Sequence, residues 1–199
     1  MPGPYRRGVC SWCRAIVPLF LLLIIAFTCL PVYALTKQSN SCNSLLNLRF
    51  RDALPAEEQQ YLGILRKSSF TLKDIQGTLL VIEVFSTYCT SCPRDIPVLN
   101  EVYSSVRKER GLRESVRVFS IAIGNTRTEV EGYIKEFRAL YPVLTDYNFI
   151  AHKALGDPRV PFTLIVRNTA QGRCVIEYTH QGVLTSAEEI LRVLKSCIP

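Results

Sequence analysis

A pair of cysteines, Cys89 and Cys92, stands between a run of strand-forming residues and a stretch with helical periodicity. The run before them, residues 79–85, is apolar except for Glu83, which predicts a central strand covered on both faces. The stretch after them, residues 93–108, repeats apolar side chains three and four positions apart, as an amphipathic helix does. Two cysteines separated by two residues at a strand-to-helix junction form a reversible dithiol where the compartment favours such chemistry.

The first 35 residues have the order of an export signal. Three arginines and no acidic residue accompany the start of an apolar run over residues 15–35. The triplet 32–34 near its end is of the kind that signal peptidase cleaves. The run also has the length of about 20 residues that spans a bilayer, so an uncleaved anchor is the alternative to a cleaved signal peptide. Both alternatives place the remainder outside the cytoplasm, in the periplasm or on the outer face of the cytoplasmic membrane.

The remainder divides into a polar linker over residues 36–54 and one domain over residues 55–199. The chain has 199 residues, of which 48% are hydrophobic, and this is enough for one core of ordinary size. The formal net charge of +7 is spread without a basic run, which is typical of a solvated surface and not of a nucleic-acid interface. We therefore expect no nucleic-acid partner.

The elements expected after the cysteines alternate between strand and helix. They are a strand over 115–123, a helix over 126–141, an extended piece at 142–144, strands over 162–166 and 174–179, and a helix that ends at 196. The complete order is β-α-β-α-β-β-α. This order predicts an α/β domain with a mixed central sheet and helices on both faces.

This order, with a dithiol after the first core strand, resembles the thioredoxin fold and, within it, the TlpA/ResA-like thiol-disulfide oxidoreductases. The resemblance covers residues 60–197. It is carried by residues 85–97 around the cysteines, then 141–146, then 160–165. The chain departs from the family where Tyr88 replaces a tryptophan, where Thr-Ser separates the cysteines, and where Val160 replaces a threonine.

The two cysteines have different expected roles. Cys89 would lie at the N-terminus of the helix, where free N–H groups and the helix dipole favour a thiolate. Cys89 is therefore the expected nucleophile, and Cys92, one turn later, the expected resolving cysteine of a redox-active disulfide. A static disulfide or a metal site is the alternative. A zinc site needs two further ligands, which the sequence does not pair with these cysteines, so we expect neither a metal nor a cofactor.

Two acidic residues accompany the dithiol. Glu83 lies six residues before Cys89 in the apolar strand, so we expect a buried carboxyl group with a raised pKa that accepts the proton of Cys92. The alternative is that Glu83 points outward at a sheet edge. Asp95 lies three residues after Cys92, and the resemblance implies an acid there that raises the thiol pKa and favours reduction. The alternative for Asp95 is an ordinary acid in the first turn of a helix.

Pro161 precedes an apolar strand and resembles the cis-proline that faces the dithiol in this family. The resemblance implies that Pro161 blocks metal binding and that the backbone of Val160 pairs with a client. Tyr88 completes the expected client-binding residues. A trans proline at a strand start is the alternative.

Three further cysteines follow the apolar run. Cys174 opens the last strand and Cys197 closes the last helix. A strand of about 7 residues and a helix of about 12 advance by similar lengths in opposite directions, so we expect these two residues to form a structural disulfide. Cys42 then remains as a free or intermolecular thiol.

The sequence thus predicts an exported thiol-disulfide oxidoreductase that acts in cell redox homeostasis by reducing or exchanging disulfides of client proteins. The resemblance implies a membrane dithiol as electron donor, and clients of the apocytochrome c or copper-site type. A Cu(I) carrier that uses Cys89 and Cys92 as soft ligands is the alternative of another class. A thiol peroxidase is a further alternative, which the spacing of the cysteines disfavours.

Overall fold

The computed structural model describes residues 42–168 and 174–198. The predicted signal peptide or anchor over residues 1–35, and the first residues of the predicted linker, lie outside the described residues. No helix among the described residues is both long enough and apolar enough to cross a membrane.

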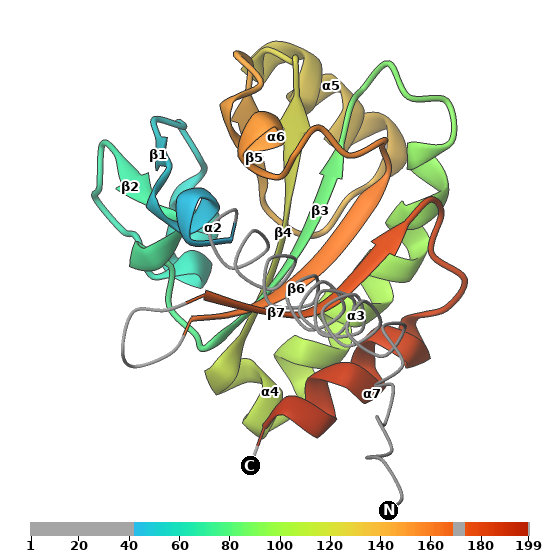
Figure 1. Cartoon of the computed structure of the whole chain (residues 1–199). Coiled ribbons are helices and arrows are strands. Elements are labelled where there is room, and N and C mark those ends of the chain that lie inside the picture. The colour runs from blue at the N-terminus through green and yellow to red at the C-terminus, as the bar shows by residue number, and fades with distance from the viewer. Residues whose placement is uncertain (1–41, 169–173, 199) are drawn as a thin grey trace, which may run out of the picture. The chain divides into compact units, whose positions relative to one another are not determined.

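A five-stranded sheet in the order β5-β4-β3-β6-β7 forms the centre of the domain (Figure 1). Its strands are β3 (Leu79–Phe85), β4 (Val116–Ile123), β5 (Val143–Asp146), β6 (Phe162–Asn168) and β7 (Cys174–Gln181). β3, β4 and β5 are parallel, whereas β6 runs antiparallel to β3 and β7 runs antiparallel to β6. The predicted mixed sheet is confirmed.

One face of the sheet is covered by α3 (Ile96–Lys108), α4 (Arg110–Ser115), α5 (Arg127–Phe137) and α7 (Ala187–Cys197). The crossovers β3-α3-β4 and β4-α5-β5 step in the same direction along the sheet. Because such crossovers are right-handed, they place α3 and α5 on the same face. The side chains of these helices pack against Leu79, Val81 and Phe85 of β3.

The other face is covered by the N-terminal part of the described chain and by α6 (Ile150–Ala154). That part comprises helical residues 42–47, β1 (Arg49–Phe50), α2 (Ala56–Leu62), β2 (Phe70–Thr71) and the 3₁₀ turn η2 (Leu72–Asp74). It packs against Leu80, Ile82 and Val84, the alternate residues of β3.

The folded domain extends further toward the N-terminus than the predicted boundary at residue 55. Leu45, Leu46 and Phe50 are buried against the sheet. The carboxylate of Asp52 accepts hydrogen bonds from Arg127 Nη2 at 2.6 Å and from the Thr145 hydroxyl at 3.1 Å. Residues 42–54 are therefore part of the domain. Their polar residues suggested a linker, but their apolar side chains are buried and Asp52 forms an ion pair with Arg127.

The helix after the cysteines begins later than residue 93. Residues Cys92–Asp95 form a 3₁₀ turn, η3, and the α-helix α3 starts at Ile96. Pro97 thereby lies in the first turn of α3, where its missing N–H breaks no helical hydrogen bond. α5 likewise ends at Phe137 and not near 141, because Arg138 adopts a left-handed conformation with φ 57°.

Candidate active site

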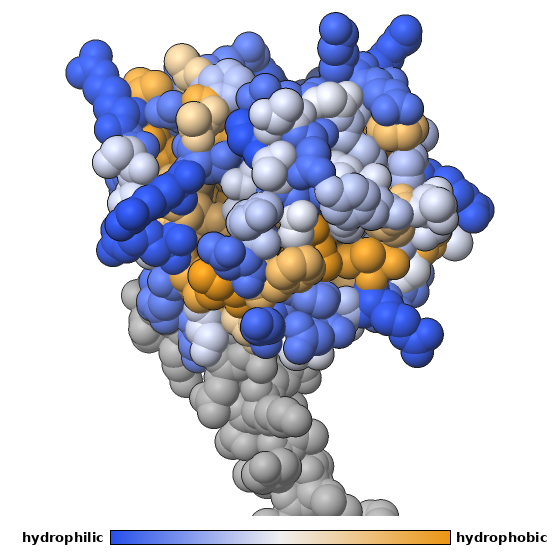
Figure 2. Space-filling model, turned by 90° about the horizontal axis from the view of Figure 1, so that it is seen from above, coloured by the Kyte–Doolittle hydropathy of each residue, from blue (hydrophilic) through white to orange (hydrophobic). Residues whose placement is uncertain are grey.

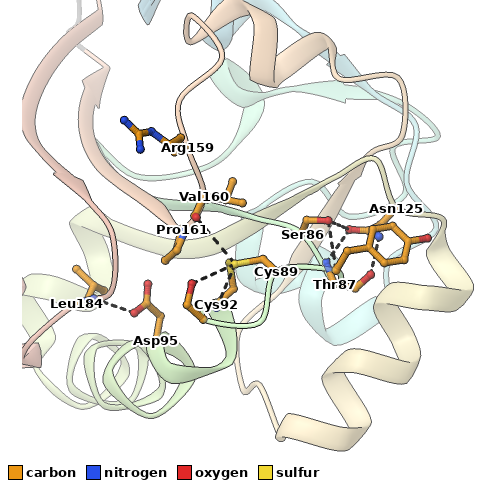
Figure 3. The surroundings of a disulfide bond; sticks show 12 residues. Ser86, Thr87, Cys89, Cys92, Asp95, Asn125, Arg159, Val160, Pro161 and Leu184 are labelled. Carbon is orange, nitrogen blue, oxygen red and sulfur yellow. Dashed lines mark hydrogen bonds between the residues drawn. A yellow bond between two sulfur atoms is a disulfide. The ribbon is translucent and has the colours of Figure 1, made fainter.

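The dithiol lies where β3 ends and η3 begins (Figure 3). Cys89 and Cys92 form a disulfide with a Cα–Cα distance of 5.5 Å. Cys92 is fully buried among the side chains between α3 and the sheet, whereas Cys89 is only partly buried. The two sulfurs are therefore unequal, since an approaching molecule meets Cys89 first.

The surroundings of Cys89 favour negative charge on its sulfur. The backbone N–H of Cys92 points at Cys89 Sγ from 3.2 Å, and the Ser91 hydroxyl oxygen lies 3.5 Å from the same sulfur. The N-terminus of the helical segment formed by η3 and α3 adds the positive end of its dipole. Hydrogen bonds and a helix terminus are the features that lower the pKa of a thiol.

The segment before β6 faces this sulfur. The Val160–Pro161 peptide bond is cis, as expected from the sequence, and the Val160 carbonyl oxygen lies 3.9 Å from Cys89 Sγ. The Pro161 carbonyl in turn accepts the backbone N–H of Gly182 at 2.9 Å and the side-chain amide of Gln181 at 3.3 Å. The end of β7 thus holds the Val160–Pro161 segment against the dithiol.

Glu83 is buried within the sheet, with 2% of its surface exposed. It alternates with Leu80, Ile82 and Val84 along β3 and so faces the side of α3. Its Oε2 accepts a hydrogen bond from the Ser120 hydroxyl at 2.6 Å, while Oε1 has no partner. Burial raises the pKa of Glu83 from 4.5 to about 8. The expected burial of Glu83 is thus observed, and the alternative of an edge position is excluded because β3 is the middle strand.

Asp95 is fully buried at the end of η3, beside Cys92 (Figure 3). Its Oδ1 accepts the backbone N–H of Leu184 at 2.8 Å, and its Oδ2 has no partner. Burial raises the pKa of Asp95 to about 6, against the opposing effect of the hydrogen bond from Leu184. Asp95 is therefore not an exposed acid of an ordinary first turn.

Asn125 also belongs to the site, although no motif in the sequence predicts it. Its Oδ1 accepts the backbone N–H of Thr87 at 2.9 Å and the Ser86 hydroxyl at 3.3 Å, and its Nδ2 donates to the Thr87 hydroxyl at 2.6 Å (Figure 3). Asn125 is fully buried and holds the loop that leads into Cys89. Its only signal in the sequence is its place just after β4, the parallel neighbour of β3.

Exposed aromatic and apolar side chains surround the same end of the sheet. Tyr88 is 71% exposed, and its hydroxyl donates to Glu129 at the start of α5. Tyr147, Phe149 and Ile150, which follow β5, are also exposed. A band of hydrophobic residues bordered by hydrophilic ones crosses the surface in this view from above (Figure 2). The surface around Cys89 thus offers apolar contacts to an approaching chain.

Metal ligands at this site would be the two sulfurs in their reduced state. Within residues 42–168 and 174–198, no group of three or more His, Cys, Asp or Glu side chains is placed to hold a metal ion. The chain's two histidines bind backbone carbonyls: His152 that of Pro158, and His180 that of Val183.

The predicted disulfide between Cys174 and Cys197 is wrong. Cys174 is bonded to Cys42, and Cys197 is a free thiol. Cys174 and Cys42 are buried on the face covered by residues 42–75, whereas Cys197 ends α7 on the opposite face. The prediction used only the lengths of the last strand and the last helix. Those lengths place the two cysteines at a similar level along the sheet, but they do not say on which face of the sheet each cysteine lies.

The comparisons with known proteins agree with this geometry. No family model matches the chain. A thiol-disulfide oxidoreductase ResA of Geobacillus thermodenitrificans is 24% identical over 128 residues, which are 64% of this chain and 68% of the relative. A ResA of Oceanobacillus iheyensis is 24% identical over 166 residues, which are 83% of this chain and 79% of the relative.

Solved structures share the fold. A DsbF homologue from Corynebacterium diphtheriae has a TM-score of 0.51 and 16% identity, and the match covers 75% of this chain and 83% of that one. A secreted thiol-disulfide isomerase from Corynebacterium glutamicum has a TM-score of 0.51 and 16% identity, with 63% and 74% covered. The chain thus shares the fold of these structures and has a paired-cysteine site at the end of its central strand. Together with the curated relatives, these features support a ResA-like thiol-disulfide oxidoreductase.

Proposed function

We propose that this protein is an exported oxidoreductase that reduces or exchanges disulfides of client proteins, with Cys89 as nucleophile and Cys92 as resolving cysteine. The observation that carries the proposal is the unequal burial of the two sulfurs beside the Val160 carbonyl. A client reaches Cys89, while Cys92 meets only the sulfur of Cys89. This asymmetry is what a two-step exchange requires.

In the reductive direction, the Cys89 thiolate attacks one sulfur of a client disulfide. A mixed disulfide forms, and the other client sulfur leaves as a thiolate. Cys92 then loses its proton and attacks Cys89 Sγ, which releases the second client sulfur and closes the Cys89–Cys92 disulfide. Two electrons pass from the dithiol to the client, and a donor dithiol must restore them.

Glu83 is the proton acceptor for Cys92 in this scheme. Its side chain faces the side of the sheet on which Cys92 is buried. A pKa of about 8 is close to that of an ordinary thiol, about 8.5, so a proton moves between the two groups at little cost. In the opposite direction, the same carboxyl group returns the proton to Cys92.

Asp95 adjusts the reactivity of the dithiol. A carboxylate beside Cys92 opposes a second negative charge on the sulfurs and so raises the thiol pKa. A raised thiol pKa stabilises the disulfide relative to the thiolate form. Asp95 in its charged state therefore favours the reductant role.

The client-binding residues in this proposal are Tyr88, Val160 and Pro161. The Val160 backbone, next to Cys89 Sγ, suits pairing with an extended client segment. Tyr88 adds an exposed ring one residue before the nucleophile. The surrounding apolar surface supports a client that is a polypeptide and not a small thiol.

Export and partners complete the proposal. The basic and apolar N-terminus supports export, and one solved neighbour is described as secreted. An exported dithiol needs electrons from across the membrane, so a membrane dithiol is the donor.

The resemblance to ResA suggests that the clients are proteins of cytochrome c maturation or proteins with copper sites. Fractionation of cells that express the full chain tests export, and recovery in the cytoplasm contradicts it.

The catalytic proposal is tested by insulin reduction with Cys89→Ser and Cys92→Ser variants. We expect Cys89→Ser to abolish activity and Cys92→Ser to accumulate a mixed disulfide with the client. Activity that survives in Cys89→Ser overturns the assignment. A tight stoichiometric Cu(I) complex of the reduced protein, without reductase activity, supports the carrier function instead.

A further inference from the structure

A single peptide group joins His180 to Asp95. His180 Nε2 lies 3.1 Å from the carbonyl oxygen of Val183, and the N–H of Leu184 donates to Asp95 Oδ1 at 2.8 Å. These two atoms belong to the same peptide group, between residues 183 and 184. Because a carbonyl oxygen only accepts, Nε2 carries the proton in this contact. His180 thus donates to one end of the group, and the other end donates to Asp95.

His180 also lies in a row of residues that crosses the sheet beneath the dithiol. The strand register places His180 opposite Thr163, and Thr163 opposite Glu83. Residues directly opposite on neighbouring strands share a face, so these side chains lie on the side of α3 and α7. Glu83 Oε1 and Asp95 Oδ2 are buried in this region without hydrogen-bond partners.

From this arrangement we infer that His180 is a positioning residue for the dithiol chemistry. It fixes and polarises the peptide group between Val183 and Leu184, and that group stabilises the carboxylate of Asp95 beside Cys92. A hydrogen bond at one end of a peptide group strengthens the bond at the other end. The inference rests on the role that the proposed function gives to Asp95.

Titratable and charged groups face Asp95 from several of the elements packed around it. Glu83 faces it from β3, Tyr133 from α5, and His180 from β7, while Arg94 belongs to its own turn. Tyr141, just before β5, completes the set. Arg94 is exposed to solvent, so water screens its charge. The Leu184 N–H is the hydrogen bond that the Asp95 carboxylate accepts.

The test measures the alkylation of Cys89 by iodoacetamide against pH in the reduced protein, together with its exchange equilibrium with glutathione. Replacing His180 with leucine removes the donor, so Asp95 holds its proton to higher pH and the thiolate of Cys89 forms at lower pH. We expect the alkylation profile to move to lower pH, and the equilibrium to shift about twofold to fourfold toward the reduced protein. His180→Phe serves as a second apolar variant, and His180→Gln, which keeps an N–H donor, should stay close to the parent protein.

The other histidine is the matched control. His152 Nε2 also contacts a backbone carbonyl, that of Pro158 at 2.8 Å, but away from Asp95, so His152→Leu should leave the profile in place. In an Asp95→Asn background, His180→Leu should add nothing, because the two residues act through one contact. A lower melting temperature with an unmoved profile, an equal shift for His180→Gln, or additive effects with Asp95→Asn would each overturn the inference. These readouts need only a reactive thiol at Cys89, so they remain interpretable if insulin reduction fails.

Discussion

Replacing Glu83 with glutamine removes a buried acid whose ionisation opposes folding. Burial raises the pKa of Glu83 from 4.5 in an unfolded chain to about 8 in the folded domain. The folded state therefore binds the proton more tightly, and the resulting stability is fully present below pH 4.5 and is lost as the pH rises toward 8. At about 1.4 kcal/mol for each pKa unit, this group costs the parent protein about 3 to 4 kcal/mol between pH 5 and pH 8.

The glutamine side chain cannot ionise, and its oxygen can still accept the hydrogen bond from Ser120. We expect Glu83→Gln to lose this part of the pH dependence and to be more stable than the parent protein at pH 8. Urea unfolding of the oxidised protein at several pH values between 5 and 8 measures the difference. Glu101→Gln, the same change at an exposed position of α3, is the control and should follow the parent protein.

Parallel curves for the parent protein and Glu83→Gln would refute the reasoning, because they would mean that Glu83 has a similar pKa in both states. The variant should also resolve mixed disulfides more slowly, since Cys92 loses its proton acceptor. A gain in stability at pH 8 together with slower resolution links the buried acid to the chemistry.

Three further changes test the parts of the structure that support the site. Cys42→Ala removes the disulfide to Cys174, which links residues 132 positions apart. The free energy of unfolding should fall by about 2 to 5 kcal/mol, and insulin reduction should be retained. Loss of reductase activity in a folded variant contradicts this expectation. Asp52→Ala leaves the guanidinium of Arg127 without its carboxylate and should cost about 3 kcal/mol in urea unfolding, and an unchanged midpoint argues against the ion pair. Asn125→Ala frees the loop before Cys89 and should lower kcat/KM for insulin reduction by about tenfold, whereas an unaltered value removes Asn125 from the site.

Much of the fold follows from local patterns in the sequence. The run that is apolar except for Glu83 predicts β3 with its bounds at residues 79 and 85, because a strand covered on both faces needs no polar alternation. The start of α3 is displaced to Ile96 because Pro97 fits only the first turn of a helix. Neither α4 nor α6 is predicted, since helices of six and five residues carry too little periodicity to be recognised.

The residues of the site also differ in whether the sequence predicts them. Cys89, Cys92 and Asp95 lie close in sequence, and their spacing alone brings them to one helix start. Asn125, just after β4, and His180, in β7, come to the site from distant parts of the chain, and no motif around either residue marks it. The predicted disulfide between Cys174 and Cys197 was wrong for a related reason: the face of the sheet on which a side chain lies depends on packing.

The sequence by itself determined the dithiol, the central strand that carries it, and the buried acid six residues upstream, because each depends on residues within one or two turns of the chain. The tertiary structure decided which cysteine bonds to Cys42, which distant side chain holds the loop before Cys89, and which backbone N–H binds the carboxylate of Asp95. These contacts join residues up to 132 positions apart. They exist only once the sheet has brought its strands together, so no local pattern encodes them.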